Sequence, residues 1–302
     1  MKVLERYEPL VDDPEAFYAA CQRRLPVTVR ANPIKASLDR VQRALDEEDV
    51  GWEACDWNPR VMTVDTEYPG NTWANFHGWV HGQEEVSALP PVVVDPQPGE
   101  RVWDACAAPG GKTTQLAALM DDEGLVVAND NNLGRLSALR SNAERLGVTN
   151  VAVTNRDARR FSLSPFGDEP FDRALVDAPC SCEGTVRKNP EVLDEWSEEH
   201  VRHVAGLQKG ILRRAIQATR KGGTVVYSTC TFAPEENEAV LDHVLKKEEC
   251  QIRPIDVDLE TCPGITEWDG EEYDSQVEDA VRIYPHHNDT GGFFCAKLEV
   301  SG

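Results

Sequence analysis

Two short motifs place a cysteine directly after an apolar run, where it could act as a nucleophile. DAPCSC (residues 177–182) follows FDRALV, and YSTCT (residues 227–231) follows TVV. A cysteine thiolate can form a covalent intermediate that divides one difficult reaction step into two easier ones. Its reactivity depends on a lowered thiol pKa, which a nearby cation such as Lys112 could provide. The motifs predict covalent catalysis by Cys180 or Cys230.

Methylation of a pyrimidine carbon is one reaction that needs such a thiol. Carbon 5 of cytosine is too weak a nucleophile to take a methyl group from a sulfonium unaided. A thiolate that adds to carbon 6 makes the ring an enamine, and carbon 5 can then attack. A zinc site is the alternative for Cys180, Cys182 and Cys230, but C-x-C with one distant cysteine lacks the usual C-x2-C pairs. We therefore expect no metal.

A glycine turn in DACAAPGGK (residues 104–112) could hold a cofactor. Gly110 and Gly111 would let the backbone approach a ligand where a predicted strand passes into a predicted helix. The pattern is not a P-loop, because position 106 is cysteine where that motif requires glycine. No G-x-G-x-x-G spacing occurs here either. A tight connection without a ligand remains the alternative for the glycine turn alone.

Acidic residues end the strands that follow this turn. Asp130, Asp157 and Asp177 stand at the ends of the second, third and fourth predicted strands. A carboxylate at Asp130 could bond both ribose hydroxyls of an adenosyl ligand, and Asp157 could accept from an adenine amino group. Because a buried carboxylate is costly without a partner, these positions suggest a ligand. Helix N-caps and solvated loop acids are the alternative.

The elements that must position these residues alternate between strands and helices from about residue 100. Such alternation predicts an α/β fold with a doubly wound, mostly parallel sheet. Lys221-Gly222-Gly223 would end the longest helix, and two final apolar runs suggest an antiparallel edge. Strands are expected at residues 100–107, 124–130, 150–157, 171–179, 222–230, 280–285 and 291–300. Helices are expected at residues 112–121, 133–146, 198–220 and 233–247.

Residues 1–90 predict a smaller α/β unit ahead of a large domain at 91–302. It contains a predicted strand at 27–32 and an N-capped helix at 37–48. The proline-rich stretch 89–100 is expected to join the two parts. This small unit is also locally basic, through a set of residues that could contact a nucleic acid. They are Arg23, Arg24, Arg30 and Lys35.

Taken together, the motifs resemble the Sun-type family of RNA cytosine-5 methyltransferases, closest to its archaeal tRNA-modifying members. The matching text is DACAAPGGKT, DAPCSCEGTVRKNPE, LQKGIL, YSTCTFAPEENEAV and TGGFFCAKL, with VTVRANPIK as a weaker match. The resemblance implies a Rossmann-like fold that uses S-adenosylmethionine. It also implies an RNA substrate, with tRNA favoured over rRNA, whose target base must be unstacked to reach the site.

The resemblance also implies a role for each motif residue. Cys230 would be the nucleophile, Cys180 would assist product release, and Asp177 would engage both base and cofactor. The loop containing Arg187, Lys188 and Asn189 is a candidate RNA contact. The cofactor would be held by Cys106, Ala107, Ala108, Pro109, Gly110, Gly111, Lys112, Asp130, Arg135, Asp157 and Asp177.

The charge of the chain is unusual for a protein that binds RNA. Its 302 residues contain 53 acidic and 31 basic side chains, a net charge of −22, and only 9 of the basic residues are lysine. A pervasively acidic, lysine-poor surface suits a very salty cytosol, so we expect a halophilic source. High salt also weakens phosphate attraction, which leaves more of the recognition to shape. An acidic protein without a nucleic-acid partner is the alternative.

Further features bear on location and on rival functions. Nine cysteines, an odd and irregularly spaced set, suit a reducing compartment, and the N-terminus has no apolar signal segment. We expect a cytoplasmic protein without membrane spans. An rRNA methyltransferase, a small-molecule methyltransferase and a non-catalytic RNA-binding assembly factor of the same fold are the rival functions. The sequence does not indicate an oligomeric state.

Overall fold

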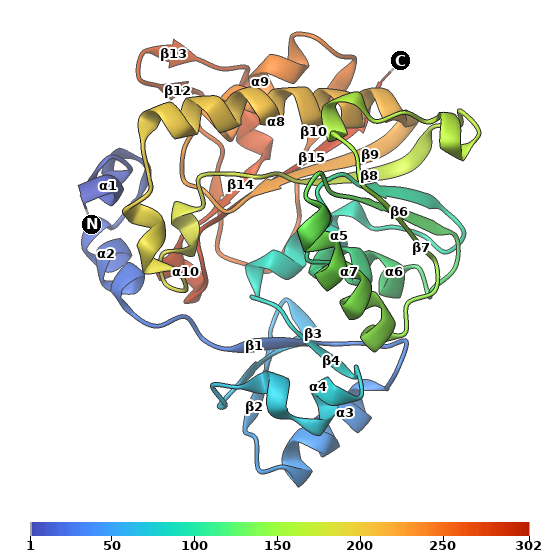
Figure 1. The fold of residues 1–302 in the computed structure, drawn as a ribbon. Helices are drawn as coiled ribbons and strands as arrows, with labels where there is room; N and C mark the ends of the chain where they lie inside the picture. The colour runs from blue at the N-terminus through green and yellow to red at the C-terminus, as the bar shows by residue number, and fades with distance from the viewer. Residues whose placement is uncertain (1, 302) are drawn as a thin grey trace. The chain divides into compact units, whose positions relative to one another are not determined.

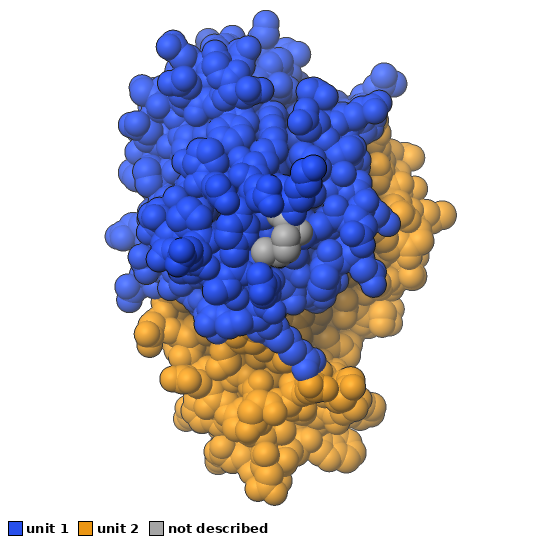
Figure 2. Space-filling view, turned by 90° about the vertical axis from the view of Figure 1, so that its left-hand side faces the viewer, with its two compact units in different colours: residues 1–25, 159–170, 176–302 blue, residues 26–158, 171–175 orange. Residues whose placement is uncertain are grey.

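The structure, a computed structural model, describes residues 2–301 and divides by internal contacts into two compact units (Figures 1 and 2). Unit 1 contains residues 1–25, 159–170 and 176–302, and unit 2 contains residues 26–158 and 171–175. Strand β8 (Phe171–Asp177) contributes residues to both units. The sequence analysis instead placed a boundary near residue 90, between an RNA-binding part and a catalytic part. That functional division stays a prediction.

Unit 2 contains the predicted parallel strands and their helices. The strand order is β8-β5-β6-β7, and β5 pairs in parallel with both β6 and the middle of β8. Val102, Val126 and Leu116 are fully buried, as expected for strands covered by helices. The elements are β5 (Arg101–Asp104), α6 (Gly111–Leu119), β6 (Leu125–Asn129), α7 (Leu133–Leu146) and β7 (Val151–Thr154).

The small antiparallel sheet of unit 2 has the strand order β2-β3-β1-β4. Helix α3 begins as predicted, with the Ser37 side chain accepting from the Arg40 amide. Its inner face packs on the sheet through a cluster that includes Val41, Leu45 and Met62. The elements are β1 (Thr28–Ala31), α3 (Leu38–Glu47), β2 (Trp52–Cys55), β3 (Asn58–Val64), α4 (Trp73–Phe76) and β4 (Val80–Gly82).

The proline-rich stretch contains a helix that the sequence analysis did not predict. It forms helix α5 (Leu89–Val94), in which Leu89, Val93 and Val94 are buried. Proline is tolerated in the first turn of a helix, where its missing N–H has no intrahelical partner to lose. The apolar content of this stretch therefore decided its structure, and the prolines did not prevent a helix.

Unit 1 supplies the antiparallel part of the predicted sheet. Its strand order is β11-β14-β15-β9-β8, and β10 also pairs with β15. β15 runs antiparallel to both β9 and β14, as the sequence predicted. The elements are α8 (Glu198–Ala218), β9 (Thr219–Thr229), α9 (Glu238–Leu245), β10 (Cys250–Arg253), β11 (Cys262–Pro263), β14 (Val281–Ile283) and β15 (Phe293–Val300).

The remaining elements are short. They are α1 (Lys2–Glu5), α2 (Pro14–Gln22), α10 (Pro285–Asn288), β12 (Glu267–Trp268) and β13 (Glu271–Glu272). Short 3-10 helices are η1 (Glu8–Leu10), η2 (Pro69–Asn71), η3 (Val86–Ala88), η4 (Ala158–Arg160), η5 (Ser164–Phe166), η6 (Glu183–Thr185), η7 (Pro190–Leu193) and η8 (Ser275–Asp279). No helix within residues 2–301 combines the length and apolar character needed to cross a bilayer.

Two local predictions were wrong. Lys221-Gly222-Gly223 does not cap α8, because Thr219 adopts extended geometry and already begins β9. The helix expected from residue 233 begins only at Glu238, since the preceding residues form turns.

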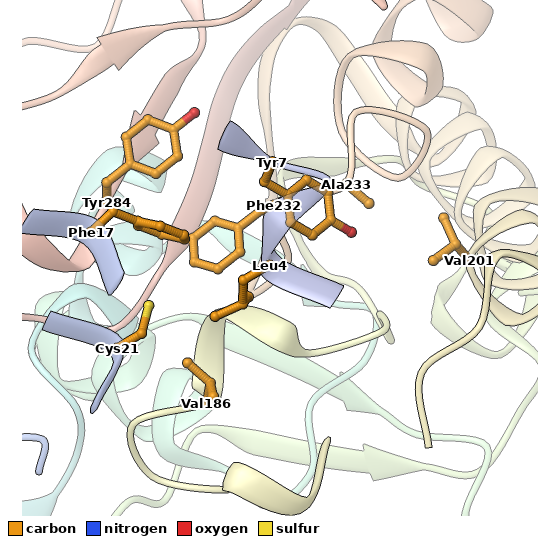
Figure 3. Close-up of a cluster of buried hydrophobic side chains, with 9 residues drawn as sticks. All are labelled: Leu4, Tyr7, Phe17, Cys21, Val186, Val201, Phe232, Ala233 and Tyr284. Atoms are coloured by element: carbon orange, nitrogen blue, oxygen red, sulfur yellow. The ribbon is translucent and has the colours of Figure 1, made fainter. Parts of the chain in front are cut away.

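The first helices of unit 1 are held by an aromatic cluster (Figure 3). Leu4, Tyr7 and Phe17 pack with Phe232, which follows β9, and with Tyr284, which follows β14. The Phe17 ring meets Phe232 edge-on at 5.3 Å and Tyr284 at 6.3 Å between centroids. The N-terminal segment is therefore part of the core beside the loop that carries Cys230.

Candidate active site

Three cysteine sulfur atoms meet in unit 1. Cys180 follows β8 and Cys230 follows β9, and their sulfur atoms are 3.2 Å apart. The sulfur of Cys182 is 3.6 Å from that of Cys180, and all three lie within 4.8 Å of one another. The structure thus brings together the two predicted catalytic thiols and adds a third.

The three thiols change one another's pKa. Hydrogen bonds from Cys180 and Cys230 lower the pKa of Cys182, whereas the bonds to Cys182 and Cys230 together with burial raise the pKa of Cys180. For Cys230, the bond with Cys180 lowers the pKa, but the bond with Cys182, burial and the Asp177 charge outweigh it and raise it. The cluster therefore holds one negative charge most easily on Cys182.

Asp177 lies beside this cluster at the end of β8. Its carboxylate accepts a hydrogen bond of 2.9 Å from the Ser228 hydroxyl, two residues before Cys230. The backbone supports the same juxtaposition, because the Ala178 amide donates to the Ser228 carbonyl at 2.9 Å. Asp177, Cys180 and Cys230 are therefore placed by two adjacent strand ends.

A buried network of carboxylates lies behind the thiols. The Ser181 hydroxyl bonds to Glu236 and donates to Glu183 at 2.5 Å, and the Tyr7 hydroxyl donates to Glu183. Glu236 also accepts from the Ser181 amide at 3.1 Å and from Gln208 at 2.8 Å. Both glutamates are fully buried, and their hydrogen bonds to Ser181 fix the loop between Cys180 and Cys182.

The protonation of this network follows from its geometry. Burial raises the pKa of Glu236 to about 8, and the nearby Glu183 charge adds to the effect. A protonated Glu236 can donate to Ser181, which then donates to Glu183. This order gives the Ser181 hydroxyl both a donor and an acceptor.

The predicted cofactor loop lies in unit 2. Gly110 has φ 103°, in the left-handed region that glycine tolerates, and it leads into α6. Asp130 is 3% exposed and accepts from the amides of Ala108 at 3.2 Å and Asn132 at 2.8 Å. Arg135 donates to the Ala108 carbonyl and lies 3.5 Å from the Asp130 carboxylate.

This loop fits an adenosyl cofactor. Each Asp130 oxygen accepts one amide hydrogen and retains a lone pair for a ribose hydroxyl. Cys106 and Gly111 are partly exposed, Ala107 and Ala108 are buried, and Pro109 is exposed. Lys112 donates to the Ser87 hydroxyl at 2.8 Å. Asp157 was predicted at the last residue of its strand, but it lies three residues beyond the end of β7 (Val151–Thr154).

Two predicted RNA contacts were wrong because the side chains are buried. Arg187 is 6% exposed and donates to the backbone carbonyls of Arg23, Arg24 and Thr290. Arg30 is 3% exposed and belongs to the interior of unit 2. Each arginine instead ties separate segments of the chain together.

Strands β5 to β8, with a glycine turn before α6 and carboxylates after the strands, define an S-adenosylmethionine-dependent methyltransferase. Residues 91–299 match the family described as 16S rRNA methyltransferase RsmB/F. The chain belongs to this RsmB/F family, and it is an RNA cytosine-5 methyltransferase.

Individual relatives agree with this assignment. The tRNA (cytosine(49)-C(5))-methyltransferase of Pyrococcus abyssi is 38% identical over 301 residues, which cover 98% of this chain and 95% of the relative. A solved methyltransferase homolog from Pyrococcus horikoshii is 31% identical, covers 99% of this chain and 94% of its own, and superposes with a TM-score of 0.86. The predicted fold class is confirmed.

A second group of relatives is longer. The ribosomal RNA small subunit methyltransferase F of Vibrio parahaemolyticus is 38% identical over 293 residues, which cover 94% of this chain but 59% of the relative. The chain thus spans about three fifths of the length of that relative.

Sequence reasoning missed two features of the site. Cys182 was noted only as a possible zinc ligand, and Ser181 with its two glutamates was not noted at all. The C-x-C spacing was a signal for Cys182, since a cysteine two residues from a catalytic one lies near it in most backbone conformations. The glutamate pair had no comparable signal, because Glu183 and Glu236 are 53 positions apart in an acidic chain.

The protonated state of Glu236 predicts a specific pH dependence of stability. Because its pKa is raised in the folded protein, its contribution is complete at low pH and is lost as pH rises from about 4.5 to about 8. Glu236→Gln mimics the protonated acid, so it should flatten this part of the profile and stabilise the protein above pH 8, by up to about 4 kcal/mol. Urea unfolding at a series of pH values measures the effect.

The neighbouring glutamate supplies a matched control. The ion pair with Arg6 outweighs burial and lowers the pKa of Glu235, so Glu235 remains ionised throughout this pH range. Glu235→Gln should therefore keep the wild-type slope between pH 5 and pH 8. Equal slopes for wild type and Glu236→Gln would show that Glu236 is not the titrating group.

Proposed function

We propose that this enzyme methylates carbon 5 of a cytosine in tRNA, with Cys230 as the covalent nucleophile. The tRNA substrate is supported by the Pyrococcus abyssi relative, which matches the chain over nearly its whole length. An rRNA substrate is the alternative, supported by the family description and by the longer relative from Vibrio parahaemolyticus. The nearly full coverage of the tRNA enzyme favours the first.

The 3.2 Å contact between Cys180 and Cys230 carries the mechanistic part of the proposal. Cys230 adds to carbon 6 of the base, and the ring electrons shift to carbon 5. Asp177 hydrogen-bonds N3 and the exocyclic amine of the adduct. S-adenosylmethionine supplies the methyl group when bound. Cys180, in contact with the Cys230 sulfur, assists the elimination that releases the methylated base.

The cofactor residues are proposed from the geometry of unit 2 and from the family motif. Asp130 would bond the ribose hydroxyls, and Asp157 the adenine amino group. The loop from Cys106 to Lys112 would place backbone groups along the cofactor, with Arg135 fixing its Ala108 carbonyl. Asp177 would face both cofactor and base.

RNA contact is proposed for exposed residues only. All five of the basic or polar residues proposed here are exposed: Arg23, Arg24, Lys35, Lys188 and Asn189. Unit 2 also exposes three aromatic side chains on which unpaired bases could stack. They are Tyr68, Trp73 and Phe76.

A halophilic, cytoplasmic origin is a further proposal. Its support is the net charge of −22 with few lysines, and nine cysteines that form no disulfide among the residues that the structure describes. Free thiols suit a reducing compartment. An excess of surface carboxylates keeps a protein hydrated and soluble when salt is abundant.

The substrate proposal is tested by methyl transfer to defined RNAs. The purified enzyme should transfer labelled methyl groups to a tRNA transcript that contains cytosine 49, and only weakly to a 16S rRNA transcript. The matched control is the same tRNA with uridine at position 49, which should remain unlabelled if this cytosine is the target. Labelling of the rRNA with none in the tRNA would reverse the choice of substrate.

The two thiols should give opposite phenotypes when they are removed separately. Cys230→Ala should abolish turnover and form no RNA–protein adduct, because no nucleophile remains. Cys180→Ala should still attack but stall as a covalent complex with methylated RNA. A denaturing gel of each variant incubated with RNA and S-adenosylmethionine shows the adduct as a slowly migrating band. An adduct with Cys230→Ala and none with Cys180→Ala would exchange the two roles.

The acidic charge predicts that the fold depends on salt. Self-repulsion of a −22 net charge destabilises the compact state unless ions screen it, and the Debye length falls to about 3 Å at 1 M salt. The melting temperature should therefore rise markedly between low and molar potassium chloride. Equal melting temperatures in both solutions would remove the argument for a halophilic source.

A further inference from the structure

We propose that Cys182 is a third catalytic thiol, which takes the proton of Cys230 so that Cys230 can attack the base. This inference rests on the proposed function, in which Cys230 is the nucleophile. It assigns a chemical role to the one sulfur in the cluster that the two-cysteine mechanism does not use.

The sulfur atoms form a continuous path for a proton. Cys230 contacts Cys180 at 3.2 Å, and Cys180 contacts Cys182 at 3.6 Å. Cys180 can donate to one neighbour while it accepts from the other, because a thiol is both a donor and an acceptor. A proton that leaves Cys230 can therefore reach Cys182 without passing through solvent.

The backbone at Cys182 has an unusual conformation for a residue with a side chain. Its φ is 64°, in the left-handed region that favours glycine. The Cys182 carbonyl accepts from both the amide and the hydroxyl of Thr185 at 2.8 Å, and the Gly184 amide donates to the Cys230 carbonyl at 3.0 Å. The segment is thus tied to Cys230, and the thiol is kept where glycine would cost less.

The charged groups around the cluster favour a thiolate on Cys182 over one on Cys230. Asp177, at the end of β8, faces Cys230 and opposes a negative charge there. His200, on α8, lowers the pKa of Cys182 and so favours a negative charge on that sulfur. Glu183 and Glu236 lie behind the loop and are bonded to Ser181. Before RNA binds, the cluster therefore stores its base on Cys182.

The activation step is a balanced proton transfer. Cys230 gives its proton to Cys180 while Cys180 gives its own to Cys182, so the charge moves from Cys182 to Cys230. A lone pair on the Cys230 sulfur then forms the bond to carbon 6, and the electrons of the carbon 5–carbon 6 double bond move to carbon 5. No oxidant, reductant or metal takes part.

The test replaces Cys182 by glycine, which suits its backbone conformation, and separately by serine. Two quantities are measured against pH: single-turnover methylation of tRNA, and alkylation of Cys230 by iodoacetamide without RNA, followed by mass spectrometry. With one thiol fewer to share the negative charge, the pH at which each rate begins to fall on the acidic side should rise by at least one unit. Below that pH, the methylation and alkylation rates should each be roughly tenfold lower than in the wild type. The RNA concentration for half-maximal rate should not change.

Cys262→Ser is the matched control, because Cys262 is also half-buried in unit 1 but lies outside the cluster. Its pH profiles should equal those of the wild type. A uniform loss of rate in Cys182→Gly without a shift would mean a structural role and overturn the proposal. One equivalent of bound metal in the wild type, lost in Cys182→Gly, would overturn it as well. Failure of the wild type to methylate any RNA would instead contradict the proposed function.

Discussion

Two buried glutamates share the hydroxyl of Ser181, and the placement of the cysteines proposed for catalysis depends on this constraint. Glu183 and Glu236 are fully buried and cannot both be charged at low cost. One proton on Glu236 resolves the conflict and orders the whole chain of hydrogen bonds. The loop that carries Cys180 is thereby joined to the turn that follows Cys230, so the cysteines are held by a rigid polar interior.

Unit 2 contains a comparable constraint around a buried cation. Arg30, in β1, donates to neutral oxygens only within the part of the chain that the structure describes, among them the Gln83 side chain and the Gly111 carbonyl. Burial lowers the pKa of this guanidinium to about 9, and nearby arginines add to the effect. Such a costly group is retained where it links the small antiparallel sheet to the turn expected to hold the cofactor.

The sequence by itself determined the fold class and the residues that are proposed for catalysis and for cofactor binding. Alternation of apolar runs with helical periodicity identified strands β5 to β8 and helices α6 to α8, because burial of one face leaves a regular pattern in the chain. The motif cysteines and Asp130 were predictable because strand ends and glycine turns are local features. The helix within the proline-rich stretch was not predicted, because the prolines gave no sign that its apolar side chains are buried.

Only the tertiary structure decided which charged groups are buried and which sulfur atoms touch. Arg187 and Arg30 looked like surface cations in the sequence, yet both are buried and donate hydrogen bonds to distant segments of the chain. Cys182 and Cys230 are 48 positions apart, and their proximity depends on two strand ends that come together only in the folded chain. Protonation is set by distances between groups, and no local pattern encodes distances between remote parts of a chain.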